Sequence, residues 1–239
     1  MWSICTKELR QFFSSLTGYI AIIVFLLVNG LVLFVFNNNI LDRGYASLED
    51  FFSFAPWVLV LLVPAICMRS FADEYKGGTF EILRTRPITS WMIVSGKFCG
   101  SLLVVVIALL PTLVYYFTIN SLAATSGIDA GAAAGSYLGL FFLSAVFTAI
   151  STAVSSFTSN AVVAFIISLI SCAALYYGFG AVSQLPALQN GADYYVGMLG
   201  IESHYQSISR GVLDTRDLVY FISTAGFFLL ITRHNISTR

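Results

Sequence analysis

The sequence predicts an all-α membrane protein with about six spanning helices. Of its 239 residues, 58% are apolar and only 10% are charged, whereas soluble domains carry roughly 25% charged residues. Long apolar runs recur along the whole chain, so no soluble domain is left over. The basic residues are also unevenly distributed among the polar segments. We therefore expect a single transmembrane domain over residues 1–239.

The first predicted element is an interfacial helix over residues 1–18. Leu9, Phe12, Phe13 and Leu16 recur at helical spacing, and polar or charged residues occupy the opposite face. This pattern is typical of a helix lying in the membrane surface, although a plain extension of the first span would also fit. The following apolar run is too long for a signal peptide and no A-x-A cleavage site follows it, so we expect an uncleaved helix.

Six apolar segments are predicted to span the membrane, because each approaches the roughly twenty residues that cross its hydrocarbon core. They cover residues 19–36, 51–68, 98–119, 136–157, 161–182 and 218–232. Pro56, Pro64 and Pro111 lie inside two of them and predict kinks. The sixth segment is short for the membrane. It could extend through Val212 and Leu213 or lie where the bilayer is thin.

The distribution of Lys and Arg predicts the orientation of the chain. With the N-terminus in the cytoplasm, nine basic residues fall on cytoplasmic loops and three outside, so both termini are expected inside. The inside set is Lys7, Arg10, Arg69, Lys76, Arg84, Arg86, Lys97, Arg233 and Arg239, and the outside set is Arg43, Arg210 and Arg216.

The spans so defined contain essentially no carboxylate, lysine or histidine. Proton-coupled transporters need such groups within the membrane, so that class is disfavoured. Ser151, Thr152 and Ser155 could contribute to a sodium site, but they also suit close helix packing. His204 and His234 look isolated in the sequence.

Catalysis is not indicated by any motif. The chain has no GxxxxGK[ST] phosphate-binding loop, and we expect no catalytic residue, no metal and no cofactor bound by this chain. The four cysteines lie far apart in or beside apolar segments, so we expect them to be buried rather than redox-active. Their positions are Cys5, Cys67, Cys99 and Cys172.

The most distinctive polar segment covers residues 69–97, after the second span. Gly77 and Gly78 interrupt it, Thr79 is a plausible N-cap, and Glu81 falls in the first turn, where the helix dipole favours a carboxylate. Pro87 is expected to end the helix. The pattern predicts a short amphipathic helix at the cytoplasmic surface, which would dock into a groove of a soluble partner or simply connect two spans along the membrane.

This segment resembles the coupling-helix region of ABC-2 type transporter permeases, which rests on a nucleotide-binding ATPase. The residues that carry the resemblance are Glu74-x-x-x-Gly78-Thr79-x-Glu81-x-Leu83-x-x-x-Pro87. The N-terminal stretch up to Tyr19 is similar to the interfacial helix of the family. Residues 207–217 are similar to the segment before the last span in the nitrous-oxide-reductase maturation and gliding-motility branches. Within the family, the chain is most similar to the gliding-motility-associated permeases of the GldF type.

The resemblance implies an ABC-2, type V exporter-like fold in the bacterial inner membrane, coupled to a separate cytoplasmic ABC ATPase that uses ATP and magnesium. It also implies a second permease chain, either an identical copy or a related subunit such as a GldG-like protein. The residues that it assigns to ATPase coupling are Glu74, Gly78, Thr79, Phe80, Glu81, Leu83 and Pro87, with Glu74 and Glu81 as polar contacts.

Two alternatives remain open from the sequence. A force-transmitting or scaffold subunit would use the same ATPase without moving a substrate, and a secondary transporter or channel would need no ATPase. No residue identifies a substrate. The extracytoplasmic stretch 183–217 is too long for a simple turn and could hold a re-entrant or surface helix.

Overall fold

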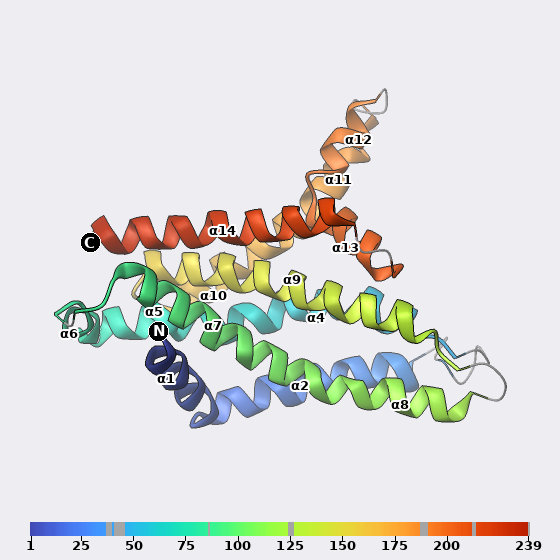
Figure 1. The fold of residues 1–239 in the computed structure, drawn as a ribbon, viewed down its shortest axis with the longest axis horizontal. Helices are drawn as coiled ribbons and strands as arrows, with labels where there is room; N and C mark the ends of the chain where they lie inside the picture. Colours follow the sequence, from blue (N-terminus) through green and yellow to red (C-terminus); the bar gives the residue numbers. More distant parts are fainter. Residues whose placement is uncertain are drawn as a thin grey trace.

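The chain folds into a bundle of long helices, as the composition predicts (Figure 1). The computed structural model describes residues 1–36, 40, 46–85, 87–123, 127–186, 191–211 and 214–238, without the side chain of Arg84. No strand occurs among these residues. The long helices are α2 (Leu16–Phe34), α4 (Glu49–Cys67), α7 (Ser90–Leu109), α9 (Ala130–Phe157), α10 (Ala161–Ala173) and α14 (Thr215–Thr238).

Shorter helices extend or connect these six. They are α1 (Trp2–Phe13), α5 (Arg69–Lys76), α6 (Thr79–Arg84), α8 (Leu113–Leu122), α11 (Phe179–Ser183), α12 (Ala192–Gly197) and α13 (Ile201–Ser209). Together the described elements form six helical segments long and apolar enough to cross a membrane, which confirms the predicted fold class. The segments are Leu16–Phe34, Glu49–Lys76, Ser90–Leu122, Ala130–Phe157, Ala161–Ser183 and Thr215–Thr238.

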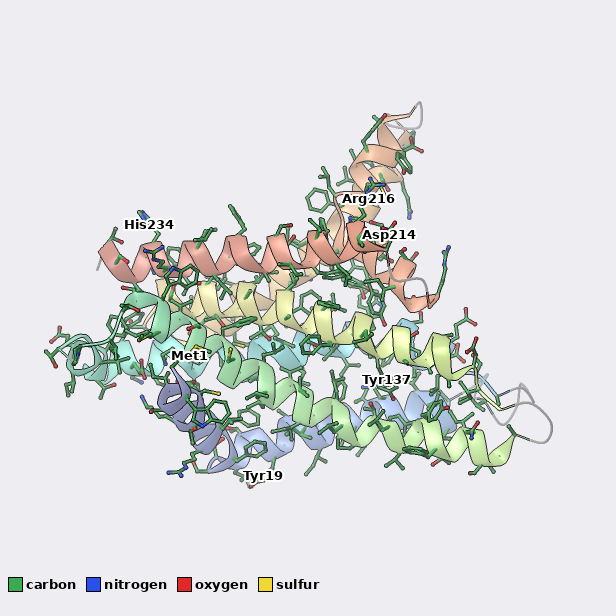
Figure 2. The ribbon with its side chains drawn as sticks, in the orientation of Figure 1. Met1, Tyr19, Tyr137, Asp214, Arg216 and His234 are labelled. Carbon is green, nitrogen blue, oxygen red and sulfur yellow. The ribbon has the colours of Figure 1, made fainter. Side chains whose placement is uncertain are left out.

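Both termini lie at one end of the bundle, together with α1, α5 and α6 (Figure 1). We call this the proximal end, and the opposite end, which carries α8 and α13, the distal end. Figure 2 shows that His234 of α14 lies at the proximal end, whereas Arg216 of α14 and Asp214, which precedes the helix, lie at the distal end. The segment α11–α12 projects away from the bundle (Figure 1).

Local irregularities fall near the prolines. Pro56 and Pro64 lie inside α4, and the single residue Met68 separates α4 from α5. Pro111 lies in a 3-10 turn, Leu110–Thr112, between α7 and α8. Proline lacks the amide proton that continues a regular helix, and the 3-10 turn at Pro111 is an irregularity of this kind. The kinks expected at Pro56 and Pro64 stay predictions. A further irregularity, the π-helix Ala174–Gly178 that joins α10 to α11, contains no proline.

The last spanning helix is longer than its apolar run suggested. α14 has 24 residues and, at 1.5 Å per residue, a length of about 36 Å. It starts at Thr215, and Val212 and Leu213 lie outside the described residues. The added length comes mainly from the C-terminal side, where Arg233, His234 and Asn235 remain helical. The expected shortfall is therefore absent.

α9 forms the centre of the bundle and packs against α4, α7, α10, α13 and α14. Small residues permit this close approach. A Cβ atom on Gly139 would lie 3.2 Å from Ile208 of α13, and one on Gly135 would lie 3.0 Å from Gly211. Small residues of α9 therefore allow α13 to pack closely, and the buried charged side chains Glu74, Lys97 and Asp217 lie near the two ends.

Candidate functional site

The junction between α5 and α6 is built around Gly78. Gly78 has φ +66°, in the left-handed region that favours glycine. It occupies the N-cap position, while Thr79 is the first helical residue and donates its hydroxyl to the Glu74 carbonyl at 3.4 Å. The expectation that Thr79 caps the helix is therefore wrong by one position. The sharp turn at Gly78 lets α6 fold back beside α5.

α6 has one buried side and one exposed side. Phe80 is buried, and its ring centroid lies 4.9 Å from that of Tyr75 and 6.3 Å from that of Phe71. Ile93 and Ile236 complete this cluster, against which Leu83 packs. Glu81 and Ile82 are exposed on the other side. The helix therefore presents a mixed apolar and acidic surface at the proximal end while its aromatic side is fixed to the bundle.

Four charged side chains meet between α1, α5 and α7. Lys97 Nζ lies 2.8 Å from Glu8 Oε1 and 3.1 Å from Glu74 Oε2, and Lys7 Nζ lies 2.5 Å from Glu74 Oε1. Lys97 also donates to the Ser70 carbonyl and lies 4.8 Å from the centroid of the Phe71 ring. We call Lys7, Glu8, Glu74 and Lys97 the Lys97 cluster. Its two cations balance its two carboxylates, so the cluster is formally neutral.

The cluster overturns two expectations from the sequence. Lys97 is fully buried inside α7, which begins at Ser90, so the third span does contain a lysine. Glu74 is also buried and faces Lys7 and Lys97, so it does not present its carboxylate to a soluble partner. A buried charge needs an opposite charge, and each of these residues finds its partner on another helix.

The N-terminal helix reaches the cluster by crossing α7 at two glycines. A Cβ atom on Gly96 would lie 2.9 Å from Ile4 Cβ, and one on Gly100 would lie 2.7 Å from Glu8 Cβ. Figure 2 shows Met1 at this crossing. The spacing Gly96-x-x-x-Gly100 is the small-residue pattern that lets two membrane helices approach closely. A lysine inside such a pattern is the sequence signal that could have identified the cluster.

A serine of α9 holds the other side of α5. Ser155 Oγ accepts the amide of Phe71 at 3.1 Å and donates to the Met68 carbonyl at 3.2 Å. Thr152 donates to the Thr148 carbonyl, and Ser151 Oγ lies 3.8 Å from Cys172 Sγ. These hydroxyls contact protein partners, as packing residues do, which favours the packing interpretation over a sodium site.

Comparison with known protein families identifies the family to which this chain belongs. A family model described as "ABC-2 family transporter protein" matches residues 2–232. The chain belongs to the ABC-2 transporter family. A comparison with curated proteins gives no match.

Membership in the ABC-2 family makes the chain a multi-pass membrane subunit of a transporter whose partner is an ABC ATPase. The residues that resemble the coupling helix then divide into two groups. Glu74 and Phe80 are buried within the bundle, whereas Gly78, Thr79, Glu81 and Pro87 are exposed and Leu83 is partly exposed. Arg86 and the side chain of Arg84 lie outside the described residues.

The distal end of this ABC-2 chain contains a cavity of about 920 Å³. Phe52, Trp57, Tyr177 and Tyr205 contribute rings to its wall, and Glu202 contributes a carboxylate. Trp57 stacks on Tyr177 with ring centroids 3.8 Å apart. Partial burial raises the pKa of the Glu202 carboxyl, while a hydrogen bond from Gln206 opposes that shift. The cavity is large enough for a small organic molecule.

A buried pair joins α13 to the last span at the distal end. His204 Nδ1 lies 2.6 Å from Asp217 Oδ1, and its Nε2 lies 2.9 Å from the Met198 carbonyl oxygen. The imidazole also stacks on Tyr220. His204 is therefore not isolated, contrary to the prediction. Its partner lies 13 positions away on a different helix, so no local sequence pattern connects the two residues.

Proposed function

We propose that this chain is the permease subunit of an ATP-driven transporter and that its proximal end lies in the cytoplasm, where α6 docks onto the ATPase. The observation that supports this best is the construction of α6. Its outer surface exposes Glu81 and Ile82, while its inner surface is fixed to the bundle through Phe80. A surface helix that only connected two spans would not require an aromatic side chain packed against the bundle.

The contacts of α5 can transmit a displacement of α6 to the helices that span the membrane. A displacement of α6 would act on α5 through the Phe71, Tyr75 and Phe80 rings. α5 is linked to α9 through Ser155 and to α1 and α7 through Glu74. Packed and hydrogen-bonded elements transmit displacement as rigid bodies. ATPase closure would therefore shift the central helix α9, the N-terminal helix α1 and the third membrane segment together.

Substitutions on the exposed side of α6 test this proposal. We expect Glu81→Lys and Ile82→Asp each to weaken co-purification of the ATPase at least about tenfold, since interface residues of this kind contribute about 1–2 kcal/mol or more. Leu199→Asp is a matched control, because Leu199 is similarly apolar and exposed but lies between α12 and α13, far from α6 (Figure 1). Full binding and unchanged ATP turnover in both α6 variants would disprove docking through α6.

The proposed orientation rests on charge distribution together with the fold. The proximal end carries Lys7, Arg10, Arg69 and Lys76, and basic residues favour the cytoplasmic side. A fluorescent protein fused to the C-terminus should therefore fluoresce in cells, whereas a periplasmic phosphatase at the same position should be inactive. Phosphatase activity at the C-terminus would reverse the assignment.

Transport is favoured over purely mechanical action by the distal cavity. A volume of about 920 Å³ walled by rings and carboxylates can hold a solute or part of a lipid, which a force-transmitting subunit would not need. Bulky substitution of the small lining residue Ala133 by Trp should reduce substrate-stimulated ATP turnover. Retained stimulation in a folded Ala133→Trp complex would favour the mechanical alternative.

We further propose that a second permease chain completes the transporter, either as an identical copy or as a GldG-like subunit. We also propose that the complex lies in a bacterial inner membrane and serves gliding motility. The motility role follows from the resemblance of residues 207–217 to the segment shared by the nitrous-oxide-reductase maturation and gliding-motility branches. Deletion of the gene should abolish gliding and spare growth. Normal gliding in the deletion strain would restrict the proposal to transport.

A further inference from the structure

A second, smaller cavity lies at the proximal end, beside the Lys97 cluster and away from the exposed side of α6. Its volume is about 260 Å³, and it is enclosed by α1, the start of α2, the α4–α5 junction and α7. Its polar wall contains Glu8, Gln11, Ser15, Arg69 and Ser70. Both acidic and basic groups therefore face one small space, close to where a spanning helix begins.

Ser70 shows that the cavity is suited to a polar occupant. The residue is 5% exposed, and its hydroxyl has no hydrogen-bond partner among the described residues. Its backbone carbonyl is already used by Lys97. A buried hydroxyl without a partner is unfavourable by about 1–3 kcal/mol. A ligand that accepts a hydrogen bond from Ser70 would remove this penalty.

The side of the cavity near Arg69 is suited to a phosphate. Arg69 provides a permanent positive charge, and α2 begins at Leu16 with Ser15 as its N-cap. The Ser15 hydroxyl already accepts the Gly18 amide. The earlier amides of Leu16 and Thr17 lack acceptors within the helix, and the helix N-terminus carries partial positive charge. Arginine, a hydroxyl and a helix N-terminus are the groups that bind phosphate oxygens.

The opposite side of the cavity is suited to a primary ammonium group. Glu8 and Gln11 are three residues apart on α1 and therefore lie on the same face. Glu8 uses Oε1 for Lys97, and a carboxylate has further lone pairs on its second oxygen. The Gln11 side-chain carbonyl adds another acceptor. An ammonium with three N–H donors would satisfy these acceptors.

The surroundings of the cavity indicate a lipid. Leu16, Tyr19 and Ile20 are exposed on the first turns of α2, where the first membrane segment starts, and Figure 2 shows Tyr19 on the outer surface of the bundle. We propose that the cavity binds the head group of phosphatidylethanolamine, with the phosphate at Arg69 and Ser70 and the ammonium at Glu8. The acyl chains would then lie along α2.

Native mass spectrometry of the purified full-length chain tests the site. Palmitoyl-oleoyl phosphatidylethanolamine, phosphatidylcholine and phosphatidylglycerol would be added separately at equal concentration. We expect phosphatidylethanolamine to bind about tenfold more tightly than either of the others, a difference of about 1.4 kcal/mol. Choline cannot donate N–H bonds to Glu8, and glycerol carries no positive charge.

Two substitutions in the cavity wall test whether the lipid binds in this cavity. Arg69→Ala and Ser70→Ala should each reduce phosphatidylethanolamine binding several-fold while leaving the elution volume and helical content unchanged. Arg10→Ala is the matched control, because Arg10 is an exposed arginine on α1 that does not line the cavity. It should bind the lipid as the parent chain does.

The remaining outcomes contradict the proposal. Equal binding of the three lipids would show that the ammonium is not recognised, and unchanged binding in both cavity variants would place the lipid elsewhere. Displacement of the lipid by glycerophosphoethanolamine at equal concentration would assign the site to a soluble molecule with the same head group. The lipid-binding experiment does not use the ATPase. A negative result would therefore contradict the lipid site without affecting the proposed docking of α6 onto the ATPase.

Discussion

Lys97 shows how a single residue organises the proximal end. Its ammonium contacts carboxylates from α1 and α5 and the carbonyl of Ser70, and it is removed from water entirely. Burying an ion is unfavourable unless opposite charges and hydrogen bonds surround it. Lys97 meets both conditions, so its role is to hold three helices in one arrangement.

Replacement of Lys97 by Met tests this role. Methionine is one atom shorter than lysine but fills most of the same apolar space, and the variant leaves Glu8 and Glu74 without the cation that they share. We expect a loss of about 3–5 kcal/mol in stability, measured as a lower Tm of the detergent-solubilised protein. Lys76→Met is the control, since Lys76 is exposed and should change stability by less than about 0.5 kcal/mol. An equal effect in both variants would contradict a specific role for the cluster.

Cys5 offers a second prediction for a single residue. Burial, with a smaller contribution from the nearby Glu8 charge, raises the pKa of its thiol. A raised pKa lowers the thiolate fraction at neutral pH, and the thiolate is the reactive form. In a variant that retains Cys5 as its only cysteine, alkylation by iodoacetamide at pH 7 should be slower than that of a peptide thiol and should increase with pH. Labelling as fast as the peptide at pH 7 would show that Cys5 is exposed.

Among the elements, α1 depends most on a neighbour for its position. It lies across Gly96 and Gly100 of α7, so its placement requires both the absence of side chains there and the ion pairs of the Lys97 cluster. An interfacial helix held only by its apolar side would need neither feature. α1 is therefore a docked part of the bundle as well as an amphipathic helix.

Gly96→Leu should detach α1. A Cβ atom at this position would lie 2.9 Å from Ile4 Cβ, and inserting bulk into a packed contact costs about 1–3 kcal/mol. We expect faster alkylation of Cys5 in this variant, because the thiol becomes exposed. Gly226→Leu is the control, since nothing lies within 4 Å of a Cβ atom there. Unchanged alkylation in Gly96→Leu would mean that α1 docks by other contacts.

The elements differ in how far the sequence predicts them. The six spans follow from apolar runs that need no tertiary information, and Gly78 and Pro87 delimit the short helix α6 through their own backbone preferences. The sequence predicts Lys97 in a loop, because a lysine beside a span is normally a surface charge. The pairings of Lys97 and His204 depend on residues from other helices, which periodicity does not reveal.

At the scale of the whole molecule, the two ends are held by different interactions. The proximal end is held by ion pairs among α1, α5 and α7. At the distal end, α13 is fixed by His204 to Asp217 and by the Tyr205 hydroxyl to the Phe52 carbonyl at 2.6 Å. α9 connects the ends through its contacts with α5 and α13.

His204→Ala should loosen the distal end without affecting the proximal one. Loss of the ring leaves Asp217 buried without its partner, a cost of about 1–3 kcal/mol or more. We expect faster hydrogen–deuterium exchange in residues 201–209 and unchanged exchange in α5. Gln206→Ala is the control, because Gln206 is exposed on the same helix. Faster exchange in α5 would show that the two ends are not independent.

The Lys97 cluster also constrains the order in which the helices pack together during synthesis. Its members lie at positions 7, 8, 74 and 97, and two of its ion pairs join residues 67 and 89 positions apart. Lys7 and Glu8 leave the ribosome before the third membrane segment has been synthesised. α1 therefore stays undocked at the membrane surface until Gly96 and Lys97 have been inserted. Closure of the cluster would then mark the moment when the first half of the protein acquires its final arrangement.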